Sequence, residues 1–332
     1  MLQQSTAELP AQLLARPTKA PRALRRTGLS LALQGGGSFG AFTWGVLEEL
    51  LENGIRFDVV SGTSAGAMNA VLLASGLLEG GPDAAKRKLA RFWRGLSDAG
   101  PSRMAVDAAV ELSRFMVSPY LLNPLGLNPL RDLLLAEVDF ERLRAERPLR
   151  LLIAATRVRD GRLRLFREDE ITLEAVLASC CLPRLHHAVE IDGEAYWDGG
   201  FSANPPLRQL AMETSAEDIL LVQLLPEQGA SAVPRNGKEI TETLSKLAFR
   251  EPLLKELEAL EDLRTLCSAQ KLLPSKQCRK ILRLRLHRLA AEDAVPGVAS
   301  ESPLHVDWPL LTRLHAAGAE AASRWLAGYE RS

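Results

Sequence analysis

Apolar runs and helical apolar spacings alternate along the first eighty residues. Residues 30–34 form a short apolar run, and apolar residues then recur at helical spacing up to a stop at Asn53 and Gly54. Residues 57–61 repeat the pattern of a buried strand, and residues 67–78 follow as an apolar helix. Two consecutive units of strand, glycine turn and helix predict a parallel sheet.

The next part of the chain has a mainly helical pattern. Residues 82–98 and 105–116 have helical spacing, and Asn128 followed by Pro129 is typical of a helix start. Residues 120–129, with their repeated Asn-Pro pairs, are interpreted as a loop. We therefore expect a helical insertion over about residues 82–145, rich in leucine at positions 121, 122, 125, 127, 130, 133, 134 and 135.

Strand patterns return after this insertion. Residues 149–158 and 162–166 flank the turn Asp160-Gly161, which predicts a hairpin, and Thr172 is a candidate cap for a helix that ends near Cys180. A second turn, Asp192-Gly193, separates residues 189–191 from 195–197, so that Asp198 lies just past a strand end. The remaining expected elements are a strand at 218–225, an edge strand at 281–289 and a final helix at 309–326.

Composition and charge narrow the class of protein. The chain has 332 residues, of which 46% are hydrophobic, and its 41 basic residues balance 41 acidic ones. Such a chain has enough apolar residues for a core, which excludes a disordered or fibrous protein. A net charge of zero gives no basic excess, so nucleic acid is not expected as a partner.

Residues 1–28, the longest apolar runs and the cysteines indicate the expected cellular compartment. Residues 1–28 are basic and interrupted by prolines, so we expect a disordered arm before a single domain at 29–328. Contact of this arm with anionic membrane surfaces stays open. No secretory signal or apolar run of membrane-spanning length is evident, and the four cysteines are expected to be reduced and buried, which favours the cytoplasm or its membrane periphery.

The most informative motif is Gly-Thr-Ser-Ala-Gly at residues 62–66. It lies between an expected strand and an expected helix, which is the arrangement of a nucleophile elbow. Gly62 and Gly66 would allow the tight turn, Ser64 would project from it, and the helix N-terminus would favour negative charge nearby. An ordinary glycine turn is the alternative.

A second glycine-rich loop, at residues 35–40, permits two interpretations. Its spacing matches a dinucleotide-binding loop, but that site requires an acidic residue at the end of the second strand, and Asp58 stands at its start. The other interpretation is an oxyanion hole that faces the serine across neighbouring strand ends. The candidate residues are Gly35, Gly36, Gly37, Ser38 and Gly40.

A serine nucleophile requires a base. None of the five histidines, at positions 186, 187, 287, 305 and 315, clearly follows a sheet strand on an expected loop. Asp198 is better placed, because it ends a strand and is followed by Gly199 and Gly200, which permit close approach. We therefore expect Asp198 to be the partner of Ser64.

These motifs carry a resemblance to a known family. Gly-Gly-Gly-Ser-Phe-Gly at 35–40, Gly-Thr-Ser-Ala-Gly at 62–66 and Asp-Gly-Gly at 198–200 resemble, in order and spacing, the patatin-like phospholipases. Further likenesses to bacterial members are Ala178-Ser179, Leu182-Pro183, residues 190–193 and Asn204-Pro205-Pro206. One departure is Phe39, where many members have Arg or Lys.

The resemblance implies a fold and a chemistry. The fold would be an α/β, three-layer arrangement related to α/β-hydrolases, with a mostly parallel central sheet flanked by helices. The activity would be that of a lipid acyl hydrolase that cleaves carboxylic esters with a Ser64–Asp198 dyad. The amides of Gly36, Gly37 and Ser38 would hold the oxyanion, and no metal, calcium, nucleotide or other cofactor would be needed.

Several alternatives stay open. The same dyad would suit another acyl compound, such as a thioester, a storage polyester or an acylglycerol. A catalytically silent scaffold with the same fold is a second alternative, and a nucleotide-dependent oxidoreductase is a more distant one. The leucine-rich insertion would form either a lid over an acyl pocket or ordinary core. The sequence does not predict the oligomeric state.

Overall fold

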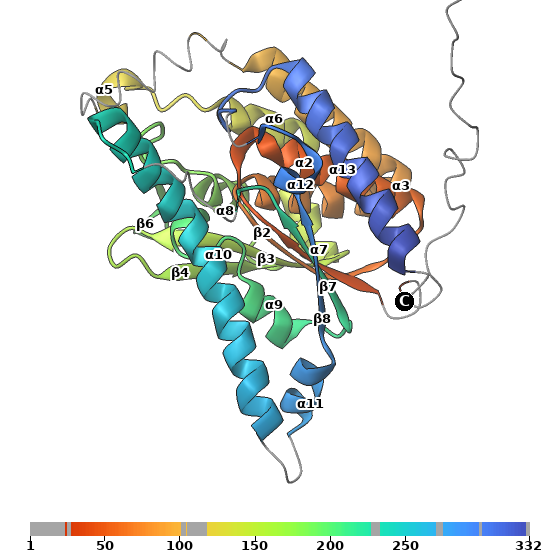
Figure 1. The fold of residues 1–332 in the computed structure, drawn as a ribbon. Helices are drawn as coiled ribbons and strands as arrows, with labels where there is room; N and C mark the ends of the chain where they lie inside the picture. The colour runs from red at the N-terminus through yellow and green to blue at the C-terminus, as the bar shows by residue number, and fades with distance from the viewer. Residues whose placement is uncertain are drawn as a thin grey trace, which may run out of the picture.

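An eight-stranded mixed sheet runs through the centre of the molecule (Figure 1). The computed structural model describes residues 24, 28–100, 104, 118–226, 233–269, 275–298 and 301–329. The expected N-terminal arm and the expected helix at 105–116 fall almost entirely outside the described residues.

The strand order is β5-β6-β3-β2-β1-β7-β8, and β4 pairs with β3. Parallel pairing joins five successive strands of this order, β1 (Leu29–Leu33), β2 (Phe57–Thr63), β3 (Arg150–Arg157), β7 (Asp218–Gln223) and β8 (Arg285–Ala290). Antiparallel pairing adds β4 (Leu163–Arg167), β5 (Val189–Ile191) and β6 (Glu194–Asp198). The mostly parallel central sheet is confirmed.

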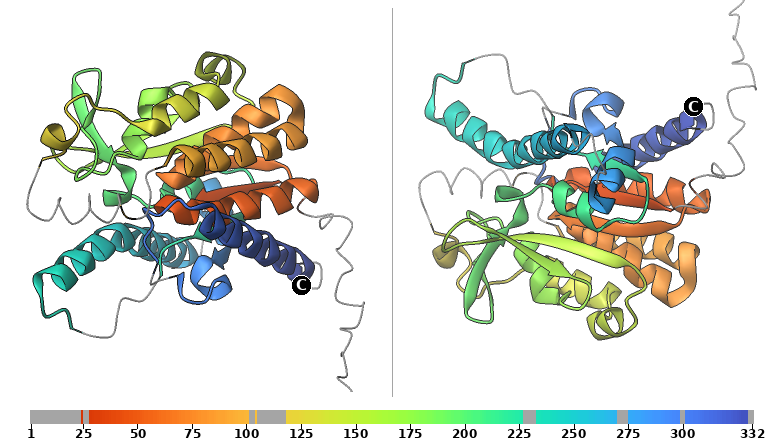
Figure 2. Two further views of the ribbon diagram at one scale, coloured as in Figure 1. Left: turned by 90° about the horizontal axis from the view of Figure 1, so that it is seen from above. Right: turned by 90° about the horizontal axis from the view of Figure 1, so that it is seen from below.

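Two helical layers cover the faces of the sheet (Figure 2). The larger core lies against α2 (Gly40–Glu52), α3 (Ala65–Ala99), α6 (Pro129–Glu137), α7 (Phe140–Glu146), α8 (Leu173–Ser179) and α13 (Trp308–Tyr329). The smaller core lies against α9 (Leu207–Glu213), α10 (Gly237–Ala269) and α11 (Lys276–Arg283). Alternate residues of β1 divide between them: Leu31 and Leu33 face the first core and Ala32 the second.

Local signals place several elements where the sequence predicts them. The Thr172 hydroxyl accepts a hydrogen bond from the Ala175 amide at the start of α8, and the Asn128 side chain accepts one from the Leu130 amide at the start of α6. The turn between β5 and β6 has positive φ at both Asp192 and Gly193. Both predicted hairpins are confirmed.

Two interpretations of the sequence were wrong. Residues 281–283 belong to α11 and not to the edge strand, because Ser275 caps this helix and turns Cys278 and Ile281 into the smaller core. The edge strand is therefore only β8. Residues 120–129 are not a continuous loop, because the Ser118 hydroxyl caps the short helix α5 (Pro119–Leu122).

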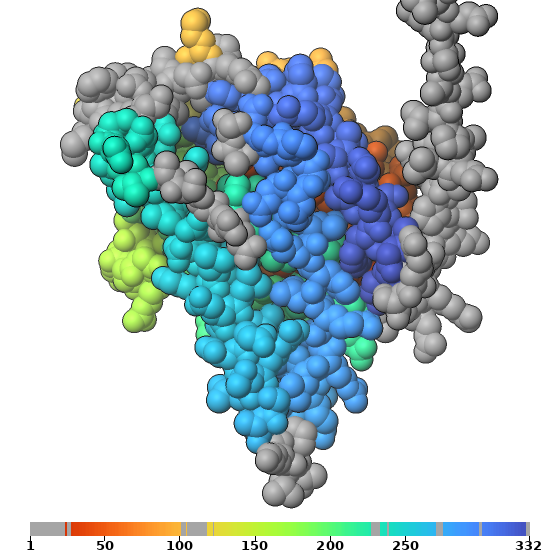
Figure 3. Space-filling view, in the orientation of Figure 1, coloured from red at the N-terminus to blue at the C-terminus, as the bar shows by residue number. Residues whose placement is uncertain are grey.

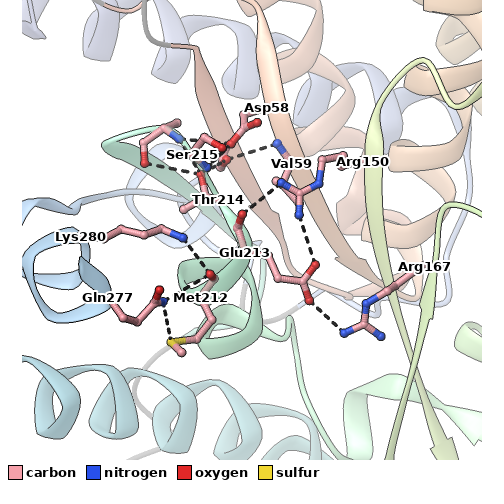
Figure 4. A network of polar contacts seen from close by, with 12 residues as sticks. Asp58, Val59, Arg150, Arg167, Met212, Glu213, Thr214, Ser215, Gln277 and Lys280 are labelled. Atoms are coloured by element: carbon pink, nitrogen blue, oxygen red, sulfur yellow. Dashed lines mark hydrogen bonds and ion pairs between the residues drawn. The ribbon is translucent and has the colours of Figure 1, made fainter. Parts of the chain in front are cut away.

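The carboxylate of Asp58 ties the start of β2 to the turn before β7 (Figure 4). Its Oδ2 accepts hydrogen bonds from the Thr214 hydroxyl, at 3.0 Å, and from the amides of Ser215 and Ala216. Asp58 thus lies at the start of β2, whereas Ser64 follows its end. A dinucleotide site would need the acidic residue at the end of this strand. The role of Asp58 is to anchor the sheet.

Asp58→Ala is expected to lower the free energy of unfolding by about 2–3 kcal/mol, because two backbone amides lose a charged acceptor. Urea denaturation would measure this change. Asp58→Asn keeps one acceptor oxygen and should cost less. Equal stability of wild type and Asp58→Ala would contradict the anchoring role.

Candidate active site

Ser64 lies at the tight turn between β2 and α3. Its backbone has φ 53° and ψ −121°, a strained conformation for a residue other than glycine. A hydrogen bond of 2.9 Å from its amide to the Ser179 hydroxyl holds this turn. The neighbouring glycines leave no room for a side chain, since a Cβ at Gly62 would lie 2.6 Å from backbone atoms of Gly66. The geometry is that of a nucleophile elbow.

The register of the sheet carries Asp198 to this turn. On one edge of β3, Ala154 pairs with Thr63, the residue before Ser64. The next residue, Ala155, pairs with Asp198 at the end of β6. β4 pairs with the opposite edge of β3 here. β6 therefore pairs with the same edge of β3 as β2, directly beyond the last residue of β2. The antiparallel strand therefore ends beside the elbow.

Asp198 is fully buried, and its two carboxylate oxygens differ in their contacts. Oδ1 accepts a hydrogen bond of 2.7 Å from the Gly200 amide, whereas Oδ2 has no hydrogen-bond partner among the described residues. Burial raises the pKa of Asp198 to about 7, although the Gly200 amide and the nearby Ser64 hydroxyl act to lower it. The carboxylate can therefore accept and return a proton near neutral pH.

The glycine-rich loop approaches the elbow from β1. A Cβ at Gly35 would lie 2.8 Å from Cβ of Ser64, and one at Gly40 would lie 2.7 Å from Cβ of Ala65. Only glycine permits this spacing. The structure therefore brings the loop at 35–40, the elbow at 62–66 and Asp198 together.

The backbone amides of the loop have different partners. The Gly35 amide donates to Oδ1 of Asn204 at 2.7 Å, and the Ser38 amide donates to the carbonyl oxygen of Pro303 at 2.7 Å. The Gly40 amide bonds back to carbonyls within the loop. The Gly36 and Gly37 amides donate to no group in the described parts of the chain. These two remain available for an anionic ligand.

Three residues to which the sequence assigned no role support this arrangement. Ser179 holds the elbow, and Pro303 holds the Ser38 amide. Asn204 is fully buried, accepts from Gly35 and donates to the carbonyl of Phe249 on α10. Ser179 and Asn204 lie in segments that resemble the family, but no local pattern in the sequence indicates which distant amide each one meets.

Cys180 is another potential nucleophile near Ser64 and Asp198. Burial raises the pKa of its thiol well above the ordinary value, and the neighbouring Asp198 adds to the shift. Burial also raises the pKa of Cys181 to about 12. Both thiols therefore stay protonated near neutral pH, and all four cysteines are buried and free, as expected.

The histidines have other contacts. His287 pairs with Asp218 at 2.7 Å and His315 with Glu48 at 2.8 Å, while His187 stacks on Tyr120. Phe39, at the position where many family members have a cation, is buried in the larger core. Within the described ranges, no cluster of His, Cys, Asp and Glu is placed to hold a metal ion, and no helix has the length and apolarity to cross a bilayer.

A model of one protein family matches residues 31–211, which include all three motifs. The chain belongs to the patatin-like phospholipase family. Its fold is the patatin fold, and its general activity is that of a lipid acyl hydrolase.

Solved structures with a related arrangement include VipD from Legionella pneumophila, at 16% identity and a TM-score of 0.43, with 91% of this chain and 67% of VipD covered. The type III effector protein ExoU has 19% identity and a TM-score of 0.29, with coverage of 77% and 69%. The ExoU–SpcU complex from Pseudomonas aeruginosa has 16% identity and a TM-score of 0.33, and the match covers 91% of this chain and 52% of that chain. A search of curated proteins finds no match.

Proposed function

We propose that this chain hydrolyses carboxylic esters of lipids, with Ser64 as nucleophile and Asp198 as general base. The sheet register supports this proposal most directly, because Ala154 and Ala155 of β3 pair with Thr63 and Asp198 in turn. The proposed nucleophile follows β2 and the proposed base ends β6, and both strands pair with the same edge of β3. The unpaired Oδ2 of Asp198 is the acceptor that such a base requires.

In the acylation step, Oδ2 of Asp198 takes the proton of the Ser64 hydroxyl while Oγ attacks the ester carbonyl carbon. The negative charge that develops on the carbonyl oxygen is held by the Gly36 and Gly37 amides and by the N-terminal end of α3. Gly35, Ser38 and Gly40 shape the loop through the hydrogen bonds described above. Collapse of the tetrahedral intermediate breaks the ester bond, and Asp198 returns its proton to the departing alcohol.

Water completes the reaction. Asp198 takes a proton from a water molecule, whose oxygen attacks the acyl carbon, and the second tetrahedral intermediate releases the fatty acid. The proton returns to Oγ of Ser64, so the enzyme is regenerated without a cofactor. Because a carboxylate is a weak base, the fixed geometry of the strands and the amides must supply much of the rate enhancement.

The activity should rise with pH through about 7. Asp198 must be ionised to accept the proton, and burial holds its pKa at about 7. We expect kcat/KM for a water-soluble ester, p-nitrophenyl butyrate, to increase about tenfold per pH unit below about 6.5 and to level off above about 7.5. A profile that is flat from about pH 5.5 to 9 would show that ionisation of Asp198 does not limit the reaction.

Labelling with a fluorophosphonate probe tests the nucleophile. Wild type should be labelled and Ser64→Ala should not, while Ser61→Ala, three residues earlier on β2, should keep its label. Fatty acid release from mixed phospholipids, acylglycerols, thioesters and polyesters then identifies the acyl compound. A folded wild type that is neither labelled nor active on any of these would overturn the proposal and favour the silent scaffold.

A further inference from the structure

Large apolar side chains are exposed in two segments that are far apart in the sequence. The first segment is α5 and the loop after it, and the second is the start of α10 with the residue run before it. We call these side chains the apolar rim: Tyr120, Leu121, Leu125, Leu127, Val233, Ile240 and Leu244. Leu121 and Leu125 are 76% and 80% exposed.

The leucines of the insertion therefore divide into two groups. Leu134 is buried, and Leu130 and Leu133 pack against the larger core, as the simpler interpretation of the sequence predicts. Leu121, Leu125 and Leu127, and also Leu135 on α6, instead face solvent. Packing among the described residues does not account for the second group.

Both segments lie at the same end of the molecule. In Figure 1, α5 and the start of α10 lie at the upper left, and both views of Figure 2 place them at the same end but in different layers. The carboxyl ends of β1 and β2, where the glycine loop and Ser64 begin, point toward this end. The apolar rim and the candidate active site thus lie toward the same end of the molecule.

The first segment is connected to Asp198 by a series of contacts through residues 181–188. Tyr120 stacks on His187, with ring centroids 4.0 Å apart, and its hydroxyl accepts a hydrogen bond from the Ala188 amide. The His187 carbonyl accepts a hydrogen bond from the Cys181 thiol, and the Cys181 carbonyl accepts one from the Asp198 amide. The position of α5 is therefore fixed relative to the dyad.

The second segment is fixed in the same way. Phe249 of α10 packs against Phe201, with ring centroids 4.6 Å apart, and its carbonyl accepts a hydrogen bond from Asn204. Asn204 in turn holds the glycine loop through the Gly35 amide. Leu244 lies about one and a half helical turns before Phe249, beyond these contacts.

Charges at this end suit an anionic surface. Residues 118–128 contain no charged side chain. Arg184, Arg235 and Lys246 are exposed and form no ion pair with a carboxylate of the described residues. Glu239 and Glu242 are the acids on the same part of α10, and the carboxylate of Glu239 is occupied by Asn236 and by the Arg235 amide.

We propose that the apolar rim docks on an anionic phospholipid bilayer, with its leucines in the interfacial layer and the three basic side chains at the phosphates. This inference rests on the proposed function, because a lipid ester must leave a bilayer to reach Ser64. A bilayer fits better than a protein groove or a second copy, because the two segments stand apart in Figure 2 and offer separate apolar points to a broad, deformable surface.

Binding is tested without hydrolysis by using Ser64→Ala as the background. The probe is large unilamellar vesicles of phosphatidylcholine with about 30% phosphatidylglycerol, and the readout is co-sedimentation over a range of lipid concentrations. Adding Leu125→Glu and Leu244→Glu should weaken binding at least about tenfold, because each substitution removes an apolar anchor and adds a repelled charge.

The chain offers a matched control for these two positions. Leu266 near the end of α10 and Leu282 on α11 are also exposed, by 65% and 45%. The end of α10 and α11 form the lower tip of the molecule, away from α5 (Figure 1, Figure 3). Leu266→Glu with Leu282→Glu should leave binding within about twofold of the background. Unchanged circular dichroism and thermal midpoint would verify that both double variants fold.

Each outcome decides the proposal. Equal loss in both double variants, no loss in either, or no binding by the background protein would overturn it. Concentration-dependent dimerisation that disappears with Leu125→Glu and Leu244→Glu, without vesicle binding, would assign the apolar rim to a second copy. Binding that is equally strong to pure phosphatidylcholine would overturn the anionic preference.

Failure of the docking proposal and failure of the proposed function are separable. With Ser64 present, Leu125→Glu/Leu244→Glu should hydrolyse p-nitrophenyl butyrate at the wild-type rate but release fatty acid from vesicles at least about tenfold more slowly. Loss of vesicle binding with intact butyrate hydrolysis supports the docking role. Absence of hydrolysis in wild type refutes the function but leaves the binding measurement valid.

Discussion

Replacement of Asp198 by asparagine should lower kcat about 1,000-fold on any ester that the wild type hydrolyses. Asparagine preserves the shape of the side chain and can still accept the hydrogen bond from the Gly200 amide. It cannot accept the proton of Ser64, which the unpaired Oδ2 of Asp198 is placed to take. Steady-state kinetics with p-nitrophenyl butyrate at about pH 8 would measure the loss, and KM should change little.

The same substitution should make the protein more stable at alkaline pH. The pKa of Asp198 is raised from 3.8 to about 7 in the folded chain, so the folded state retains a proton that the unfolded state has already lost between these values. The contribution of Asp198 to the free energy of unfolding therefore falls as pH rises from about 4 to 7 and stays low above about pH 7. The asparagine amide does not ionise, so Asp198→Asn escapes this penalty, which is at most about 4 kcal/mol.

These opposite effects distinguish a base from a structural residue. A structural aspartate would lose stability and activity together on substitution. The gain in thermal midpoint should be large at about pH 8 and small at about pH 4, where Asp198 is protonated in the folded state and partly protonated in the unfolded state. Asp218→Asn is the control, because its carboxylate pairs with Arg285 and His287 and its pKa is lowered, so it should destabilise the fold at neutral and alkaline pH. Wild-type kcat in Asp198→Asn would refute the assignment of the base.

Local sequence signals predicted the elements around the site, because each depends on a few adjacent residues. Gly62 and Gly66 indicate a tight turn, Thr172 indicates a helix start, and Asp192-Gly193 indicates a hairpin. The turn signal at Asp192-Gly193 also indicated that Asp198 lies at the end of a strand. These signals place residues within elements, but they contain no information on which elements become neighbours.

The contacts between elements required the structure. Asp198 lies beside Ser64 because the pairing partner of β3 changes from β2 at Ala154 to β6 at Ala155. The Gly35 and Ser38 amides find their partners far along the chain, in Asn204 and Pro303. No periodicity or turn motif encodes such pairings, so the sequence could not predict which amides remain for an oxyanion.

The helix at residues 276–283 illustrates a different failure. Apolar and basic residues alternate over 281–289, which predicts a strand, but residues 281–283 are the end of α11. The cap at Ser275 and the burial of Cys278 and Ile281 against α10 favour the helix. A short amphipathic run is ambiguous until its packing partner is known.

Gly66→Ala should have the largest effect on the fold of the site. A Cβ at Gly66 would clash with the carbonyl oxygen of Leu33 and would lie 2.7 Å from its carbonyl carbon, at the end of β1. Backbone atoms of a central strand cannot rotate away as a side chain would, so α3 must move away from β1. We expect a loss of at least about 3 kcal/mol in the free energy of unfolding.

Activity should fall further than this loss of stability explains. The movement would separate Ser64 from the Gly36 and Gly37 amides, and a displacement of about 1 Å can cost about 100-fold in rate. The measurements are urea denaturation and, at a temperature where the variant remains folded, kcat for p-nitrophenyl butyrate. Gly328→Ala on α13, where a Cβ meets nothing within 4 Å, is the control and should retain wild-type stability and rate. If Gly66→Ala matched Gly328→Ala in both measurements, the close contact between the elbow and β1 would not be what positions the nucleophile.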